Sequence, residues 1–255
     1  MKQATTLAVM LVAVLAVAAG ARGAPIVSEA SADSFVRAGS SNVNTNYNSG
    51  SNLPYLDVKS QSGDMQYTRK SYARFDLTDA PDTVTEATLT LTNAGFLGSS
   101  SSSKVWTFEV YGLLDNFVPG SGILGNTWGE SAITWNNAPA NNTASAYGVI
   151  AGSVYGGAPL GTFTITGTGS VGATYSISGS ALVDFLNSDT DGLGTFIIVR
   201  PTDGDTTDSI VHRFASRENA TYSGPQLSLL PEPATLVLLG LGAGVTYLSR
   251  RRRSE

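Results

Sequence analysis

Apolar and polar residues alternate with a period of two along much of this chain, which is the pattern of strands that bury one face. Residues 88–92 alternate threonine with leucine, residues 106–110 alternate large apolar residues with Thr107 and Glu109, and residues 163–165 repeat the pattern. Clusters of turn residues separate these segments from the other expected strands, at residues 34–37, 56–59, 71–77, 195–200 and 210–216. The chain is therefore expected to be an antiparallel all-β protein.

One short segment has helical rather than alternating spacing. Residues 180–187 bring four large apolar side chains into two turns, and we expect Ser180 to cap the first turn. No repeat with a period of about 20 to 50 residues is visible, which argues against solenoids and propellers. Many short strands with little helix predict a jelly-roll type antiparallel β-sandwich with one short helix.

The N-terminal segment has the pattern of an export signal. Lys2 is followed by an apolar run at residues 7–19 and then by small residues. The run is shorter than the ~20 apolar residues that a membrane-spanning helix needs. We therefore expect signal peptidase to remove residues 1–24.

The C-terminal segment, residues 230–255, has the reverse order. The motif Pro231, Glu232 and Pro233 precedes an apolar span at residues 234–249. Four basic residues follow the span: Arg250, Arg251, Arg252 and Arg253. Basic residues after a span stay on the cytoplasmic side, so the chain before the motif is expected to face outward and to contact the membrane through this hydrophobic helix.

This tail resembles the PEP-CTERM sorting signal of bacteria that produce exopolysaccharide. The resemblance covers residues 231–253 and implies that an exosortase-type membrane protease processes the tail near the motif. The protein would then be held in the inner membrane only transiently and would end at the cell surface or in the extracellular matrix. A permanent single-span anchor is the alternative, with the same topology.

The charge between the two ends excludes one class of ligand. Residues 25–230 hold nine Lys and Arg against eighteen Asp and Glu, a net charge of −9. Nucleic acid is bound by basic surfaces, so no nucleic-acid partner is expected. The chain has no cysteine, so an exported domain of this kind must be held together without disulfides.

The segments at residues 32–37, 71–77, 86–91, 128–139 and 214–218 resemble, in order, the DNRLRE domains, a family that overlaps carbohydrate-binding module family 96. The resemblance spans about residues 30–229 and implies a secreted β-sandwich, here residues 25–229, of a kind that in some members binds alginate. It also implies a set of framework residues: Asp33, Phe75, Asp76, Trp128, Glu130, Thr134, Trp135, Asn136, Pro139, Ser216, Arg217 and Glu218. Arg217 and Glu218 are expected to form an internal ion pair.

Candidate glycan-binding residues come from basic and aromatic side chains. They are Arg37, Lys59, Arg69, Lys70, Tyr72, Arg74 and Trp128. Alternation in residues 71–77 turns Tyr72 and Arg74 away from the core, onto a face that suits acidic sugars. A solvated surface with weak ion pairs is the alternative. Trp135 is expected in the core, whereas Trp128 is either buried or a sugar platform.

No catalytic residues are expected, because the single histidine, His212, alternates onto the core face with Phe214. No cofactor or bound metal is expected. Residues 187–192 imitate the start of a calcium loop, but Ile198 stands where a bidentate glutamate is required. An Asp-Gly turn explains that segment better, and structural calcium between acidic loops, such as Asp203, Asp205 and Asp208, remains an open alternative.

The expected function is a surface-sorted, non-catalytic module that binds a polysaccharide of the envelope or matrix. A structural matrix or surface-layer protein without sugar specificity is the alternative, and a polysaccharide lyase or hydrolase ranks last.

Overall fold

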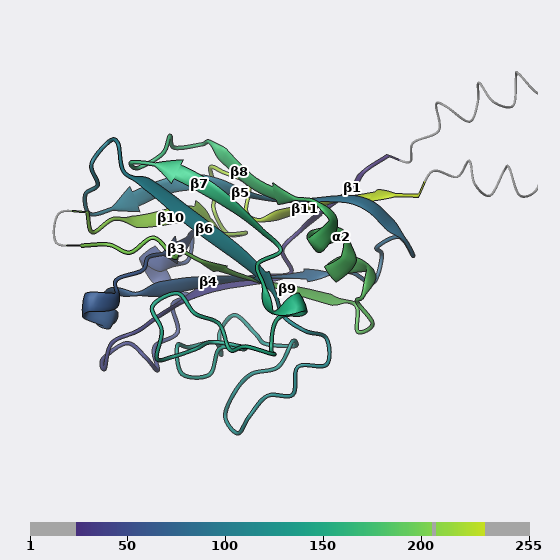
Figure 1. Ribbon diagram of the computed structural model, residues 1–255, viewed down its shortest axis with the longest axis horizontal. Helices are drawn as coiled ribbons and strands as arrows, with labels where there is room; N and C mark the ends of the chain where they lie inside the picture. The colour runs from purple at the N-terminus through teal and green to yellow at the C-terminus, as the bar shows by residue number, and fades with distance from the viewer. Residues whose placement is uncertain (1–23, 206–207, 233–255) are drawn as a thin grey trace, which may run out of the picture.

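A computed structural model describes residues 24–205 and 208–232. These residues form two antiparallel sheets packed face to face (Figure 1), which confirms the predicted β-sandwich. Most of the expected signal peptide lies outside the described residues, as do Pro233, the span 234–249 and the four C-terminal arginines. Within the described part of the chain, no helix has the length and apolar character needed to cross a membrane.

The first sheet has the strand order β1, β11, β5, β10, β3, with β8 also paired to β5. The bounds are β1 Ile26–Glu29, β3 Tyr55–Val58, β5 Val84–Leu97, β8 Thr174–Ser178, β10 Val211–Ala215 and β11 Gln226–Pro231. The second sheet has the order β2, β4, β9, β6, β7, with β2 Ala32–Arg37, β4 Arg69–Asp76, β6 Val105–Gly112, β7 Gly161–Thr166 and β9 Leu193–Val199. Every strand expected from the alternation is present, whereas β1, β8 and β11 were not predicted.

The main core lies between the two sheets. Inward-facing aromatic residues fill it, and Phe75, Phe108 and Phe196 are buried there together with leucines of β5. Helix α2, Ser180–Asn187, covers one end of this core with Leu182, Phe185 and Leu186. The helix has the predicted bounds, but its N-cap is Gly179 at φ 121° and no side chain caps it, so the prediction for Ser180 is wrong.

A second core lies on the outer face of the second sheet. The long connection between β6 and β7, residues 113–160, folds back over that sheet and buries Trp128, Ile133 and Trp135 against it (Figure 1, below β4 and β9). This connection contains the short 3-10 helix η3, Tyr155–Gly157, and otherwise consists of turns, irregular segments and isolated β-bridges. Strand β9 is consequently buried on both faces.

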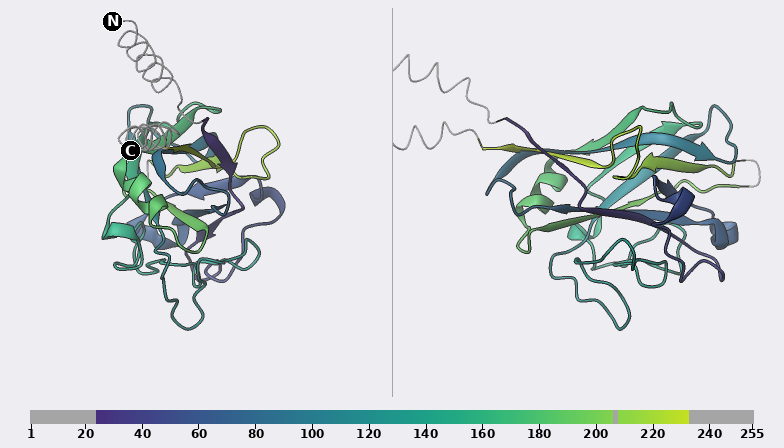
Figure 2. Two further views of the ribbon diagram at one scale, coloured as in Figure 1. Left: turned by 90° about the vertical axis from the view of Figure 1, so that its right-hand side faces the viewer. Right: turned by 180° about the vertical axis from the view of Figure 1, so that it is seen from behind.

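The ends of the described chain leave the sandwich together. Strands β1 and β11 pair antiparallel, with Ile26 opposite Leu229, so the first and last strands share one end of the molecule. The 3-10 helices η1, Gly50–Asn52, and η2, Ser62–Tyr67, follow β2 and β3. Figure 2 shows that the blue segment containing η2 lies at the opposite end from the exit of β11.

Candidate functional site

A row of basic side chains crosses three neighbouring strands near η2. Arg37, at the end of β2, lies opposite Arg69, at the start of β4. Lys59, directly after β3, forms an isolated antiparallel bridge with the same Arg69. Side chains directly opposite each other on paired strands share a face, so three like charges stand side by side. Together with Arg213 of β10, we call these residues the basic cluster.

Among the described residues, Asp57 is the carboxylate that forms ion pairs with members of the basic cluster. It is buried on β3, opposite Arg213, and its two oxygens lie 3.1 Å from Arg213 Nε and 3.5 Å from Arg69 Nε. The ion pairs among the described residues leave Arg37 and Lys59 without a carboxylate partner. The cluster therefore has three more positive than negative charges, within a domain whose net charge is negative.

Two tyrosine rings accompany these cations. Lys59 Nζ lies 5.2 Å from the ring centre of Tyr67, and the Arg37 guanidinium lies 5.9 Å from the same ring. The Arg213 guanidinium lies 4.4 Å from the ring centre of Tyr55. Tyr67 is 39% exposed, so it combines a cation contact with an accessible surface.

The electrostatics of Lys59 reflect this crowding. Burial, together with the charges of the neighbouring Arg69, Arg200 and Arg37, lowers the pKa of Lys59 to about 8. The nearby Asp64 opposes the shift without reversing it. A bound anion would favour the charged form of this lysine.

Four of the predicted glycan-binding residues are buried. Lys59 is 5% exposed beside the ring of Tyr67, and for the other three the burial corrects the prediction that they meet the ligand. Lys70, Tyr72 and Trp128 are each at most 1% exposed. Alternation did turn Tyr72 away from the main core, but residues 113–160 cover that face and make it the second core. These three side chains therefore cannot contact a polysaccharide in this conformation.

Hydrogen bonds show what these buried groups do instead. Lys70 Nζ donates to Asn141 Oδ1 at 2.8 Å and to the carbonyls of Asn142 and Gly148. Trp128 Nε1 donates to Thr195 Oγ1 at 3.1 Å. Half-buried Arg74 donates to the carbonyl of Trp128. Lys70, Arg74 and Trp128 thus hold residues 113–160 on the second sheet.

The expected framework residues mostly have structural positions. Phe75, Trp135 and Pro139 are buried, and Asn136 Nδ2 donates to Asn44 Oδ1 at 2.8 Å. The backbone N–H of Thr134 donates to Asn137 Oδ1. Exposed Asp76 accepts two hydrogen bonds from Thr78, which hold the pKa of its carboxyl below the usual range.

Asp33, Glu130 and the segment from Ser216 to Glu218 meet at one point, although they are far apart in the sequence. Ser216 Oγ donates to the carbonyl of Leu53 at 2.6 Å. Arg217 Nε lies 3.1 Å from Glu218 Oε1, as expected for an ion pair, but the Arg217 side chain is 42% exposed. The pair is therefore at the surface and not internal.

His212 is a core residue, as predicted. Its Nε2 donates to the carbonyl of Gly167, and its Nδ1 lies 3.2 Å from Arg200 Nη1, which makes Nδ1 the acceptor. Burial, together with the charge of Arg200, lowers the pKa of His212 to about 3. A histidine that stays neutral and has both nitrogens occupied is not a general base.

The acidic loops named in the sequence are satisfied by protein donors. Asp189 accepts the N–H groups of Gly192 and Leu193, as an Asp-Gly turn requires. Asp203 accepts hydrogen bonds from Ser60 and Ser62. Lys104 Nζ lies 3.3 Å from Asp205 and 3.7 Å from Asp208.

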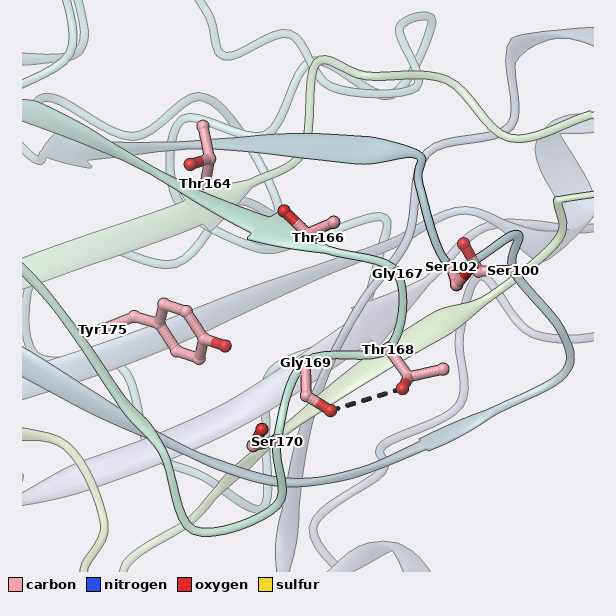
Figure 3. A pocket seen from close by; sticks show the side chains of 9 residues that line it. All are labelled: Ser100, Ser102, Thr164, Thr166, Gly167, Thr168, Gly169, Ser170 and Tyr175. Atoms are coloured by element: carbon pink, nitrogen blue, oxygen red, sulfur yellow. Dashed lines mark hydrogen bonds between the residues drawn. The ribbon is translucent and has the colours of Figure 1, made fainter.

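A separate shallow groove of about 650 Å³ lies beside the end of β7. Its lining is uncharged and rich in hydroxyl groups: Ser100, Ser102, Thr164, Thr166, Gly167, Thr168, Gly169, Ser170 and Tyr175. Figure 3 shows the Tyr175 ring at one side of the loop formed by residues 167–170. Such a lining offers hydrogen bonds to sugars but no charge for an acidic one.

Sequence reasoning missed Arg213 as a member of the basic cluster. Its neighbours His212 and Phe214 face the core, so alternation along β10 turns Arg213 outward. That signal was present in the sequence. The pairing of β10 with β3, which brings Arg213 opposite Asp57, was not.

Two comparisons with known families extend this description. A family model described as carbohydrate-binding module family 96 matches residues 24–155, which is slightly more than half of the 255-residue chain. A model described as the PEP-CTERM protein-sorting motif matches residues 230–253. No curated protein matches the chain. Strands β7 to β11, after residue 155, complete both sheets begun in the first match.

Proposed function

The chain belongs to carbohydrate-binding module family 96, and from this premise we propose that it binds an acidic polysaccharide through the basic cluster. Modules of this kind are generally non-catalytic, and the absence of a general base at His212 agrees with that role. The sorting motif marks an exported protein associated with the cell envelope. The ligand would then be a polysaccharide of the envelope or of the surrounding matrix.

The observation that carries this proposal is the row formed by Arg37, Arg69 and Lys59. Like charges directly opposite one another on paired strands destabilise a sheet. One carboxylate, Asp57, offsets only part of this repulsion. Carboxylate groups repeated along a uronic acid polymer would supply the missing negative charge and form bidentate contacts with arginine.

The tyrosines support a sugar rather than a simple anion as the ligand. Aromatic rings present an apolar face on which the C–H surface of a sugar ring can pack. Tyr67 and Tyr55 lie beside the cations of the cluster. A ligand with alternating carboxylates and pyranose faces would use both kinds of side chain.

The position of the basic cluster fits display at a surface. Strand β11 leads into the sorting motif at one end of the sandwich, and η2, which carries Tyr67, lies at the other end (Figure 2). While the tail still holds the chain in the membrane, the basic cluster would point away from the bilayer. The glycan would be reached without hindrance from the anchor.

Affinity electrophoresis tests the proposal. Residues 24–232 contain all strands of both sheets and both cores, so this segment is suited to purification as a folded unit. We expect retardation in gels that contain alginate or polygalacturonate and none in gels that contain dextran or cellulose derivatives without charge. Migration unchanged in every acidic polysaccharide would contradict the proposal.

Arg37→Gln is the cleanest variant of the basic cluster, because Arg37 pairs with no carboxylate among the described residues. We expect it to weaken retardation by about threefold to tenfold, the effect of one charged contact worth ~1 kcal/mol. Lys104→Gln is the matched control, because Asp205 and Asp208 already balance that charge. If Tyr175→Ala abolished binding and Arg37→Gln did not, the hydroxyl-lined groove would be the site instead.

A further inference from the structure

Three carboxylates from distant parts of the chain converge beside β2. Asp33 lies on β2, Glu130 lies in the connection 113–160, and Glu218 lies between β10 and β11. One oxygen from each residue lies within 4.8 Å of an oxygen from each of the others. We call these residues the carboxylate triad.

Neutral donors position the carboxylate triad without neutralising it. The N–H of Asp33 donates to Glu130 Oε1 at 2.9 Å, and Asn48 Nδ2 donates to Glu130 Oε2 at 3.0 Å. Ser216 Oγ shares its one proton between the carbonyl of Leu53 and Glu218 Oε2, which lies 3.0 Å away. The N–H of Arg217 donates to Asp33 Oδ2 at 2.8 Å. These bonds fix the orientation of all three groups.

One cation pairs with the carboxylate triad. The Arg217 guanidinium lies 3.4 Å from Glu130 Oε1 and 3.1 Å from Glu218 Oε1. Its side chain is 42% exposed, and screening by solvent weakens both pairs. Arg74 acts on Glu130 only from farther away. With all three carboxylates ionised, two negative charges would remain uncompensated.

The second observation is a buried oxygen without a partner. Asp33 is 1% exposed, and its Oδ1 has no hydrogen-bond partner in the part of the chain that the structure describes. Burial, aided by the charges of Glu218 and Glu130 and opposed by the hydrogen bond from the Arg217 N–H, raises the pKa of Asp33 to about 8. A buried charged oxygen with neither donor nor counter-ion is costly, so the group needs either a proton or a cation.

We propose that the carboxylate triad binds one calcium ion that ties together β2, the connection 113–160 and the segment after β10. Calcium takes oxygen ligands at about 2.3–2.6 Å, so two ligands on opposite sides of the ion are up to about 5 Å apart, as in the triad. The ion supplies the partner that Asp33 Oδ1 lacks. It would also stabilise an exported chain that has no cysteine for disulfides. Outside the cell, the calcium concentration is high enough to occupy sites of weak affinity.

Calorimetry and thermal unfolding of residues 24–232, purified in EDTA and dialysed free of it, test the proposal. We expect one calcium bound per chain and a rise in Tm of about 5–10 °C at 10 mM calcium, for a dissociation constant of ~0.1 mM. Sodium chloride at the same ionic strength should give no such rise. Absence of both binding and a calcium-specific rise would overturn the proposal and leave a proton on Asp33.

Two variants locate the ion. Asp33→Asn keeps the shape and the acceptor for the Arg217 N–H, so it should fold yet lose the calcium-dependent rise in Tm. Asp115→Asn is the matched control in the other acidic group, formed with Asp189 and Asp191, and should keep the rise in full. If Asp115→Asn lost the rise and Asp33→Asn kept it, the calcium would bind at that other group and the proposal would be wrong.

Discussion

At the scale of single residues, lysines that look alike in the sequence have opposite roles. Lys59 and Lys70 both flank alternating segments, and charge alone assigned them to one basic surface. Lys59 belongs to the basic cluster, whereas Lys70 lies under the connection 113–160, with its Nζ 4.7 Å from the ring centre of Trp135. Burial lowers the pKa of Lys70 to about 7. Its three hydrogen bonds make its role structural.

Replacing Lys70 tests whether this lysine stabilises the fold or binds the polysaccharide. Lys70→Met leaves one buried and two half-buried acceptors without a donor, and we expect the free energy of unfolding to fall by about 2–4 kcal/mol. Binding of acidic polysaccharide by the folded protein should stay unchanged. Urea unfolding and affinity electrophoresis of the same preparation measure both effects. A variant with normal stability and lost binding would show that Lys70 meets the ligand after all.

His212 makes stability depend on pH. Its pKa is about 3 in the folded protein and ~6.5 when unfolded, so below pH 6.5 only the unfolded chain takes up the proton. The stabilisation that comes from keeping His212 neutral in the folded protein is fully present above pH 6.5 and is lost as the pH falls toward 3. His212→Gln is the comparison, because the glutamine amide can replace both ring nitrogens. Between pH 5.5 and 4.5, we expect the free energy of unfolding of wild type to fall by about 1.4 kcal/mol more than that of His212→Gln. If urea unfolding showed the same fall for both proteins, His212 would not be a buried histidine that stays neutral in the folded state.

At the scale of elements, alternation predicted the strands but not what covers them. Segments such as residues 88–92 carry strong period-two patterns, and each became a strand. Strand β8 has only Tyr175 and Ile177 as large residues, so its pattern was weak, and the last two residues of β11 were assigned to the sorting segment. Nothing in the alternation indicated that residues 113–160 fold over the second sheet. That long-range packing buried Tyr72 and Trp128.

The connection 113–160 should contribute to stability through its tryptophans. Trp135 is 2% exposed in the second core, and we expect Trp135→Ala to lower the free energy of unfolding by about 3–5 kcal/mol. Tyr147, in the same connection, is 43% exposed, so Tyr147→Ala should cost less than ~1 kcal/mol. Chemical denaturation compares the two. Similar small losses would mean that the connection is only loosely attached.

At the candidate site, too, the sequence pattern predicted strands but not which strands pack together. Pairing of β2 with β4 brings Arg37, a predicted glycan-binding residue, beside Arg69, another one. The bridge to Lys59 and the partnership of Arg213 with Asp57 depend on which strands become neighbours across the two sheets. Local pattern does not determine that choice, so part of the basic cluster could be found only from the structure.

At the scale of the whole molecule, the sorting motif begins inside the folded domain. Pro231 is the last residue of β11, and the N–H of Glu232 donates to the carbonyl of Thr83 at 3.3 Å. The Glu232 side chain is exposed and has no structural role in this pairing. Its carboxylate is therefore available for recognition by a processing enzyme.

Replacing Glu232 tests sorting without disturbing the fold. We expect Glu232→Ala to leave the full-length chain in the inner membrane, whereas wild type at the surface should yield no peptide from residues 236–250 in mass spectrometry. Glu29→Ala, an exposed carboxylate on the neighbouring strand β1, should sort normally. Mature wild-type protein that still carries the span would identify the tail as an ordinary anchor.

The pH dependence of polysaccharide binding tests the central claim most directly, because it switches one charge of the basic cluster without altering its shape. Lys59 has a pKa of about 8, so its charge is lost between pH 7 and 9. By isothermal titration with an alginate oligosaccharide, we expect wild type to lose about threefold in affinity over that range, the effect of one charge worth ~0.6 kcal/mol. Lys59→Met should bind more weakly at pH 7 and show no step. Wild-type affinity that is constant from pH 7 to 9, or a step that persists in Lys59→Met, would contradict binding at the basic cluster.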